Sequence, residues 1–379
     1  MPLHVVFDAR HLKDFGIGTY IRNLIQALAQ LDSDSLYTLV ARPQDISEFV
    51  GLPGNFKVAP YGRPDTSVLN HITFPWFIRK LSPDLCHIPL NSIPFFMVRP
   101  YVVTIHDMSS VLYPARNELR ETAHGERYRR GALGATRVIA VSHSTRRDLE
   151  NVVGVLPARI RTIYGAPDPA FLSAESDPLG DQEILERYSI QPPFILYAGT
   201  IRPQKNVSRL IEAFAVVRAE LEHHPQFKDL RLVVIGDELS RYPAVRRAVV
   251  ATRVAPYVRF LGFVPVATLK IFYRAATVFA FPSLYEGFGL APLEAMACGT
   301  PVVASSVPSL IEAVGDAAEL VTPDNVFDIA RGLRETLLRG EYRQELVEKG
   351  RAQVQKFNWM QTGKEVLNIY QEIKHEYRK

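Results

Sequence analysis

Short apolar runs alternate with amphipathic helical patterns along most of the chain, and this alternation restricts the folds that the chain can adopt. Most of the runs are continuously apolar and rich in β-branched residues, which is typical of parallel strands covered on both faces. The runs that predict strands are "LHVVFD", "LYTLVA", "LCHIP", "YVVTIHD", "RVIAVS", "IRTIY", "FILYAGT", "LRLVVIG", "VRFLGFV", "TVFAFPS", "TPVVAS" and "AAELVT". Between them, apolar residues recur at helical spacing, as at Ile21, Leu24, Ile25 and Leu28. This β-α-β-α order predicts doubly wound α/β domains.

The length of the chain predicts more than one such domain. At 379 residues, it is too long for one ordinary core and suits two domains of about 150–200 residues. The alternation pauses in a polar, proline-studded stretch between about Asp168 and Pro193. We therefore expect an N-terminal domain over 1–175, a linker over 176–190, a C-terminal domain over 191–357 and a last helix over 358–379.

Composition excludes several functional classes. The chain is 47% hydrophobic and 22% charged, with a net charge of +4, which is ordinary for a globular protein and too weakly basic to argue for a nucleic-acid partner. Its two cysteines, Cys86 and Cys298, lie in apolar segments, which favours buried free thiols over a disulfide. The start of the chain lacks signal-peptide features, and no run of about 18 apolar residues exists to span a bilayer. We expect a cytoplasmic protein.

The loops that follow the predicted strands should carry the chemistry, because ligands bind at the carboxyl ends of strands in doubly wound sheets. The first such loop, "DFGIGTY", places Gly16 and Gly18 before a helix, where backbone N–H groups can approach an anion. A dinucleotide fingerprint would need a third glycine at Ile21, so hydride chemistry is disfavoured. A tight turn without a ligand is the alternative interpretation.

Two further loops carry ionisable residues. In "TIHDM", His106 ends an apolar strand, where it can hydrogen-bond a substrate hydroxyl or stabilise charge; a packed structural histidine is the alternative. In "YAGTIRPQKN", Arg202 and Lys205 precede a helix that Asn206 can cap. Two cations beside a helix N-terminus suit a diphosphate, although a solvated basic loop would have the same sequence.

The fourth loop, "EGFGLAPLE", combines two carboxylates with a glycine-rich turn. Pro292 suits the first turn of a short helix that ends at Gly299, which places Glu294 in that turn and leaves Glu286 in the loop. The N–H groups of 287–289 offer a phosphate cradle, but carboxylates would repel a phosphate. Their natural partners are sugar hydroxyls, so we expect Glu286 to hold a sugar and Glu294 a ribose. Support of the helix dipole is the alternative, and it suits Glu294 alone.

These segments resemble the retaining GT-B glycosyltransferases of family 4 (group 1). "EGFGLAPLEAMACGTPVVAS" is similar to the E-x7-E signature of that family, and "GIGTY", "TIHDM", "VSHSTRRDL" and "AGTIRPQKNVSRLIEAF" are similar to other family segments in the same order. The terminal "FNWMQTGKEVLNIYQEI" resembles the family's closing helix. The resemblance covers nearly the whole chain. It implies two Rossmann-like domains facing a central cleft, with the C-terminal helix crossing back onto an acceptor-binding N-terminal domain.

The resemblance also implies roles for individual residues. Arg202 and Lys205 match a diphosphate clamp, Glu286 a donor-sugar ligand, Glu294 a ribose ligand, and His106 a histidine near the reacting carbon. The catalytic set is then His106, Arg202, Lys205 and Glu286. The other donor-binding positions are Gly16, Gly18, Gly199, Thr200, Val264, Gly287, Phe288, Gly289, Leu290 and Glu294.

The implied reaction is transfer of a sugar from a nucleotide sugar with retention, without cofactor or metal. Cations and the helix dipole would stabilise the leaving diphosphate. "Asp32-Ser-Asp34", a triplet of the kind that binds metal in another glycosyltransferase fold, ends a helix and is interpreted as surface. "HIPLNSIPF" and "AGTIRPQKN" look most like mannosyltransferases of surface-polysaccharide assembly, so GDP-mannose is the expected donor and UDP-sugars the second choice. An epimerase or phosphorylase on the same fold, and a non-catalytic nucleotide-sugar binder, remain alternatives.

The expected acceptor is a saccharide or a lipid-linked saccharide at the cytoplasmic face of the inner membrane. The segment "RNELRETAHGERYRRGALG" carries Arg116, Arg120, Arg127, Arg129 and Arg130, which could give weak, salt-sensitive contact with anionic lipid. Its apolar residues are few, so a solvated helix is the alternative.

Overall fold

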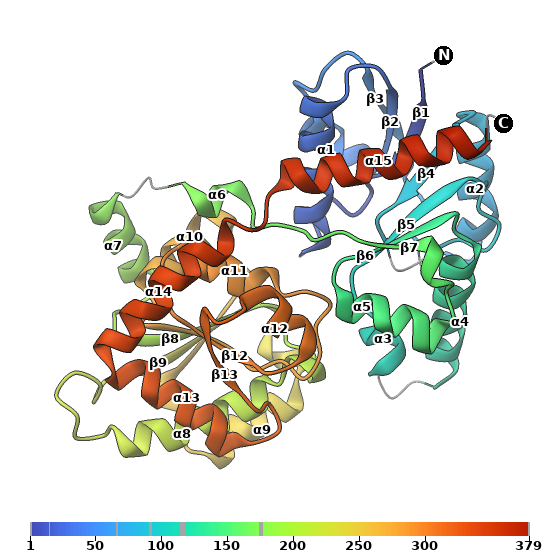
Figure 1. Ribbon diagram of the computed structural model, residues 1–379. Helices are drawn as coiled ribbons and strands as arrows, with labels where there is room; N and C mark the ends of the chain where they lie inside the picture. Colours follow the sequence, from blue (N-terminus) through green and yellow to red (C-terminus); the bar gives the residue numbers. More distant parts are fainter. Residues whose placement is uncertain are drawn as a thin grey trace. The chain divides into compact units, whose positions relative to one another are not determined.

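The computed structural model describes residues 2–14, 16–65, 67–90, 93–113, 118–173 and 177–377, without the side chains of 118–124. The chain forms two compact units. The N-terminal unit comprises Met1–Ala166 with Asn358–Lys379, and the C-terminal unit comprises Pro167–Phe357. Each unit is a parallel sheet with helices packed against it (Figure 1).

The N-terminal unit contains a seven-stranded sheet of order β3-β2-β1-β4-β5-β6-β7. The strands are β1 His4–Asp8, β2 Leu36–Ala41, β3 Phe56–Pro60, β4 Leu85–Ile88, β5 Tyr101–Ile105, β6 Arg137–Ala140 and β7 Ile160–Thr162. The helices are α1 Ile17–Leu31, α2 Asn70–Lys80, α3 Ser109–Leu112, α4 Glu118–Gly134, α5 His143–Asp148 and α15 Trp359–Tyr377. Short 3₁₀ or π segments lie at Pro43–Phe49, Leu149–Val153 and Pro157–Arg159.

The last helix, α15, belongs to the N-terminal unit and packs along α1 (Figure 1). A close approach at Gly363 allows this packing: a Cβ there would lie 2.9 Å from both Ala27 Cβ and Leu31 Cδ1. Further along α15, the Tyr370 hydroxyl lies 2.5 Å from Nδ1 of His87 on β4. The expected return of the C-terminal helix to the first domain is therefore present.

The C-terminal unit contains a six-stranded parallel sheet of order β10-β9-β8-β11-β12-β13. The strands are β8 Phe194–Ala198, β9 Arg231–Ile235, β10 Val258–Gly262, β11 Val278–Phe281, β12 Val302–Ser305 and β13 Ala318–Val321. The helices are α6 Pro169–Leu172, α7 Pro178–Arg187, α8 Val207–Glu220, α9 Pro243–Ala251, α10 Val266–Ala275, α11 Leu290–Ala297, α12 Pro308–Val314, α13 Val326–Leu338 and α14 Gly340–Val354. Single 3₁₀ turns lie at Pro203–Lys205, Leu239–Arg241 and Ala255–Tyr257. The chain order reverses between β8 and β11, and such a switch point is where doubly wound sheets bind ligands.

Two features differ from the sequence analysis. Strand β3 was not among the strands predicted from sequence. It is an edge strand whose residues are mostly half-exposed, so it lacks the continuous apolar run of a central strand. The segment 176–190, expected to be a linker, contains α7, which packs on α10 through Asp181 and the Arg274 guanidinium, 2.6 Å apart. The change of unit falls instead at Ala166–Pro167.

Candidate functional site

The loops that follow β8 and β11 are tied together at the switch point of the C-terminal sheet. The backbone N–H of Leu284 donates to the Gln204 carbonyl at 2.8 Å. The Asn206 amide donates to the carbonyls of Pro282 at 2.9 Å and Pro323 at 2.8 Å. The sequence predicted that the Asn206 side chain caps α8, and this prediction is wrong. The Asn206 amide instead connects its own loop to the loops at Pro282 and Pro323.

Lys205 and Glu286 meet across these two loops. The Lys205 ammonium lies 2.6 and 2.7 Å from the two carboxylate oxygens of Glu286, and the two side chains are only 19% and 10% exposed. The Glu286 backbone carbonyl also accepts a hydrogen bond from the Ser309 hydroxyl at 2.7 Å. The two residues expected to bind diphosphate and sugar thus form one ion pair.

Helix α11 begins directly after this pair. Gly289 precedes it with a φ of 116°, and a Cβ at this position would lie 2.5 Å from Cδ2 of Leu310, so only glycine suits the turn. Gly287 and Leu290 flank the turn, and Phe288 is buried with its ring 5.2 Å from that of Phe357. The Phe288 side chain is therefore a packing residue, and only its backbone remains a candidate for a phosphate.

Glu294 lies in the second turn of α11 rather than in the first, because the helix begins at Leu290, two residues before Pro292. The Tyr273 hydroxyl donates to the Glu294 carboxylate at 3.2 Å. Burial raises the pKa of Glu294 to about 7, and this hydrogen bond only partly opposes the shift. Tyr273 is thus a partner of a candidate site residue, and sequence reasoning missed it.

Asp237, which follows β9, accepts a hydrogen bond from the loop after β8, and sequence reasoning also missed this residue. Its carboxylate accepts from the Ile201 N–H at 3.2 Å and from the Tyr242 hydroxyl at 3.0 Å. The Thr200 carbonyl accepts from the Tyr197 hydroxyl at 2.7 Å. The only sequence signal for Asp237 was its place directly after "LVVIG", at the end of a strand next to β8.

The remaining expected donor residues of this unit have different surroundings. Gly199 follows β8 with a φ of 151°. Arg202 is exposed, and no carboxylate in the described part of the chain lies within ion-pair distance of it. Val264, after β10, is 4% exposed and packs in the interior. Among the described residues, the Arg202 guanidinium is thus a cation without an ion-pair partner, three residues before Lys205 in the same loop.

In the N-terminal unit, Gly16 precedes α1 and Gly18 lies in the first turn of that helix. Gly16 precedes the helix with a φ of 66°, and a Cβ on Gly18 would lie 2.2 Å from the Leu12 carbonyl oxygen. The turn alone accounts for both glycines, so contact with a phosphate stays a prediction.

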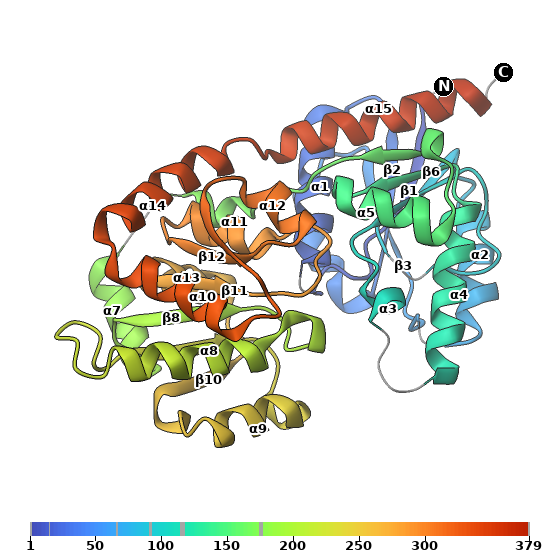
Figure 2. The ribbon, with the colours of Figure 1, turned by 60° about the horizontal axis from the view of Figure 1, so that its bottom comes forward.

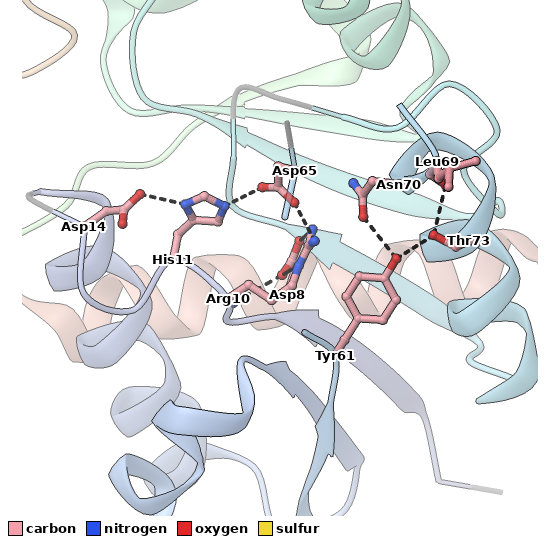
Figure 3. A network of polar contacts seen from close by, with 9 residues as sticks. All are labelled: Asp8, Arg10, His11, Asp14, Tyr61, Asp65, Leu69, Asn70 and Thr73. Atoms are coloured by element: carbon pink, nitrogen blue, oxygen red, sulfur yellow. Dashed lines mark hydrogen bonds and ion pairs between the residues drawn. The ribbon is translucent and has the colours of Figure 1, made fainter. Parts of the chain in front are cut away.

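The loop before this turn is fixed by a chain of charges (Figure 3). The Arg10 guanidinium, 3% exposed, donates to Asp8 at 2.8 and 2.7 Å and to Asp65 at 2.5 Å. The second Asp65 oxygen contacts His11, whose other ring nitrogen lies 2.6 Å from Asp14. Burial alone would lower the pKa of His11, but the hydrogen bonds to Asp14 and Asp65 outweigh it and raise the pKa to about 9. Asp65 therefore fastens the loop after β3 to the loop that leads into the Gly16 turn.

His106 follows β5 and is held by packing. Its Nε2 lies 3.2 Å from the Pro89 carbonyl, which can only accept, so this nitrogen carries the proton. Its ring meets the ring of Tyr20 edge-on at 4.9 Å, and the Tyr20 hydroxyl lies 3.2 Å from the Thr104 hydroxyl. Burial lowers the pKa of His106 to about 4, so the ring is neutral at pH 7.

Asp32 has a structural role that the sequence did not predict. It ends α1, is 7% exposed, and accepts from the Tyr37 hydroxyl at 2.7 Å and from the Ser35 N–H at 3.1 Å. It is not a surface residue. Cys86 and Cys298 are free thiols, the first buried and the second half-buried. Over the described ranges, no group of three or more His, Cys, Asp or Glu side chains could hold a metal ion, and no helix is long and apolar enough to cross a membrane.

The structure thus places Lys205, Glu286, the turn 287–290 and Glu294 in the segments that follow β8 and β11, the central strands of the C-terminal sheet. Two Rossmann-like parallel-sheet units with a returning C-terminal helix are the architecture of the GT-B fold. A solved structure, Anabaena HepE in complex with UDP and glucose, has the same fold, with a TM-score of 0.74 and 19% identity over 98% of this chain and 100% of that one.

Family models identify the particular group. The model described as Glycosyltransferase Family 4 matches residues 16–171, and the one described as Glycosyl transferases group 1 matches 182–353. The chain belongs to this family of glycosyltransferases. It is similar to the O-antigen chain mannosyltransferase B of Escherichia coli, with 29% identity over 298 residues, 78% of this chain and 76% of that protein. It is also similar to the serotype-specific mannosyltransferase WbdA of Escherichia coli, with 31% identity over 229 residues, 60% of this chain but only 28% of that protein.

Proposed function

We propose that this glycosyltransferase moves mannose from GDP-mannose to a saccharide or lipid-linked saccharide acceptor in surface-polysaccharide synthesis, with retention of configuration and without a metal. The observation that carries the proposal is the Lys205–Glu286 pair beside the start of α11 at the β8–β11 switch point. Two mannosyltransferases among the relatives support mannose as the sugar. UDP-glucose is the second candidate, because HepE is a structural neighbour solved with UDP and glucose.

In this proposal the loop after β8 binds the diphosphate. Arg202 is exposed and free to meet a phosphate, and the N–H groups at the start of α11 point their dipole at the same anion. As the bond between the anomeric carbon and the phosphate oxygen breaks, the acceptor oxygen bonds to that carbon from the same face and its proton passes to the leaving diphosphate. Negative charge grows on the diphosphate during this step, and cations held in place stabilise it without rearrangement. These groups can stabilise the charge on the diphosphate as a divalent cation would, so we expect that transfer requires no metal ion.

The carboxylates hold neutral hydroxyls. Glu286 would accept from hydroxyls of the donor sugar, and Lys205 would then turn part of its charge toward the phosphate next to that sugar. Glu294 would accept from the ribose hydroxyls, and it would do so most strongly in its ionised form. His106 is neutral at pH 7, so we propose that it hydrogen-bonds the donor sugar rather than acting as a cation.

We also propose a cytoplasmic enzyme in weak contact with the membrane that carries a lipid-linked acceptor. Of the basic residues expected to make this contact, Arg116 and the side chain of Arg120 lie outside the described residues. Arg129 and Arg130 are exposed on α4, which is compatible with such a contact.

Incubation of the protein with GDP-mannose, UDP-glucose and ADP-glucose, each with and without an acceptor extract, tests the function. We expect GDP release that depends on the acceptor and continues in EDTA. Acceptor-independent conversion of the sugar nucleotide would indicate an epimerase or hydrolase, and binding without turnover would indicate a nucleotide-sugar binder.

A further inference from the structure

Helix α2 presents an apolar stripe to solvent. Leu69, Ile72 and Trp76 follow one another at helical spacing and are 57%, 62% and 59% exposed; Val68, just before them, is 81% exposed. The opposite face of the helix, with Phe74 and Ile78, is fully buried. The stripe is therefore additional to the face that packs on the unit's core.

The neighbouring segment extends this stripe. The Phe95 ring lies 4.7 Å from the ring of His71 on α2, and Phe96 is 69% exposed. We call the six side chains together the α2 face: Val68, Leu69, Ile72, Trp76, Phe95 and Phe96. Contiguous exposed apolar groups of this kind mark interaction surfaces.

Cations border the α2 face. The Lys80 ammonium lies 3.5 Å from the centre of the Trp76 ring, and the Arg130 guanidinium of α4 lies 5.7 Å from the centre of the Phe95 ring. Arg79 and Arg129 are also exposed. Among the described residues, no carboxylate lies within ion-pair distance of Arg79, Lys80 or Arg129. Helices α2 and α4 are neighbours here, since Arg127 of α4 lies 3.4 Å from His71 (Figure 2).

We propose that the α2 face is the surface by which this chain docks on a membrane leaflet rich in anionic lipids. Aliphatic side chains and an indole that carries a cation over its ring suit the boundary between headgroups and acyl chains. Arg79, Lys80 and Arg129, which have no ion-pair partner among the described residues, suit anionic headgroups, whereas Arg130 is paired with Glu126 at 2.7 Å. This inference rests on the proposed function, because it adds the surface that would bring the enzyme to a lipid-linked acceptor. It assigns the apolar contact to α2 and leaves only charges to α4.

The two tryptophans of the chain provide a direct assay. Trp359 is 7% exposed and Trp76 is 59% exposed, so a Trp359→Phe variant carries its single indole in the α2 face. We expect its fluorescence to shift to the blue with vesicles of phosphatidylcholine mixed with phosphatidylglycerol. Partitioning should be at least about tenfold weaker with phosphatidylcholine alone or at high salt. An unchanged spectrum with the anionic vesicles at low salt would overturn the proposal.

Cosedimentation of variants separates the apolar and charged contributions. Ile72→Ser with Trp76→Ser, and separately Arg79→Gln with Lys80→Gln, should each lower anionic-vesicle binding about tenfold or more. Leu179→Ser with Val250→Ser, which changes side chains that are 76% and 75% exposed elsewhere, is the matched control and should bind like the parent. Equal binding by all of these variants would overturn the proposal. So would self-association without lipid that the Ile72 and Trp76 changes abolish, because a second copy would then be the occupant.

The inference and the proposed function can fail separately. Vesicle binding by a protein that releases no nucleotide from any donor would leave the docking surface intact and refute the transferase proposal. The Ile72 and Trp76 variant should retain its melting temperature and its transfer rate to a water-soluble acceptor, because the α2 face contains no residue placed in the donor site.

Discussion

Replacement of Lys205 tests whether one side chain both stabilises the C-terminal unit and assists transfer. In the parent protein its ammonium contacts both oxygens of Glu286 at 2.6 and 2.7 Å, and neither side chain is more than 19% exposed. Lys205→Ala leaves the Glu286 carboxylate without its counter-charge in a mostly buried position. Leaving such a charge unpaired should lower the free energy of unfolding by about 2–3 kcal/mol.

The effect on catalysis should be separate in origin. If Lys205 stabilises the departing diphosphate, its loss should lower turnover at saturating donor by about 10²–10³-fold, which corresponds to about 3–4 kcal/mol of transition-state stabilisation. The second variant, Lys205→Ala with Glu286→Gln, removes the unpaired charge as well. Its stability should return to within about 1 kcal/mol of the parent, while its turnover should stay low.

Urea unfolding and initial rates of GDP release measure the two quantities on the same samples. Unfolding followed in the presence of donor shows whether each variant still binds it. Unchanged turnover in Lys205→Ala, with the fold intact, would refute the assignment of Lys205 to the diphosphate. Recovery of turnover in the double variant would show that Lys205 acts only by neutralising Glu286.

Three further predictions follow from the pKa values and the backbone. Nucleotide binding should weaken as pH falls below about 7, because ionised Glu294 accepts from ribose hydroxyls more strongly than its protonated form does. Calorimetry should find no such dependence in Glu294→Gln, and a parent affinity independent of pH would contradict the assignment. Because the pKa of His11 is raised to about 9 in the folded protein, its protonated ring stabilises the fold by about 1–2 kcal/mol, fully at pH values below about 6.5. This contribution should disappear as pH rises through 9. A His11→Gln variant whose stability falls with alkaline pH as the parent's does would be evidence against it. Gly289→Ala should cost about 2–3 kcal/mol, because φ is 116° and Leu310 is in the way, whereas Gly340→Ala, with open space around it, should melt like the parent.

The central strands could be predicted from sequence because burial on both faces leaves a local signal. β5, for example, is buried at every position, and its sequence is apolar except for Thr104. Strand β3 was not predicted because a half-exposed edge strand shows neither a continuous nor a strictly alternating pattern of apolar residues. Helix α7 was not predicted because it lies in a polar stretch that contains prolines. One of them, Pro178, is the first residue of the helix, a position that proline favours.

For the site, sequence identified residue types and loops but not partners. Lys205 and Glu286 are 81 residues apart, and only the order of strands, with β8 beside β11, shows that they meet. The same holds for Arg10 and Asp65, which join the ends of β1 and β3. The role of Asn206 was wrongly predicted because its position before α8 matches a helix cap. In the structure, its amide donates hydrogen bonds to the carbonyls of Pro282 and Pro323 in two distant loops.

The central claim is that this chain transfers mannose from GDP-mannose with retention, using the cations and the helix start of its C-terminal unit in place of a metal. NMR of the purified product, formed from GDP-α-mannose and acceptor in EDTA, tests this most directly. We expect an α-mannoside and an equal amount of GDP. A β-mannoside, or transfer that EDTA abolishes and a divalent cation restores, would contradict it.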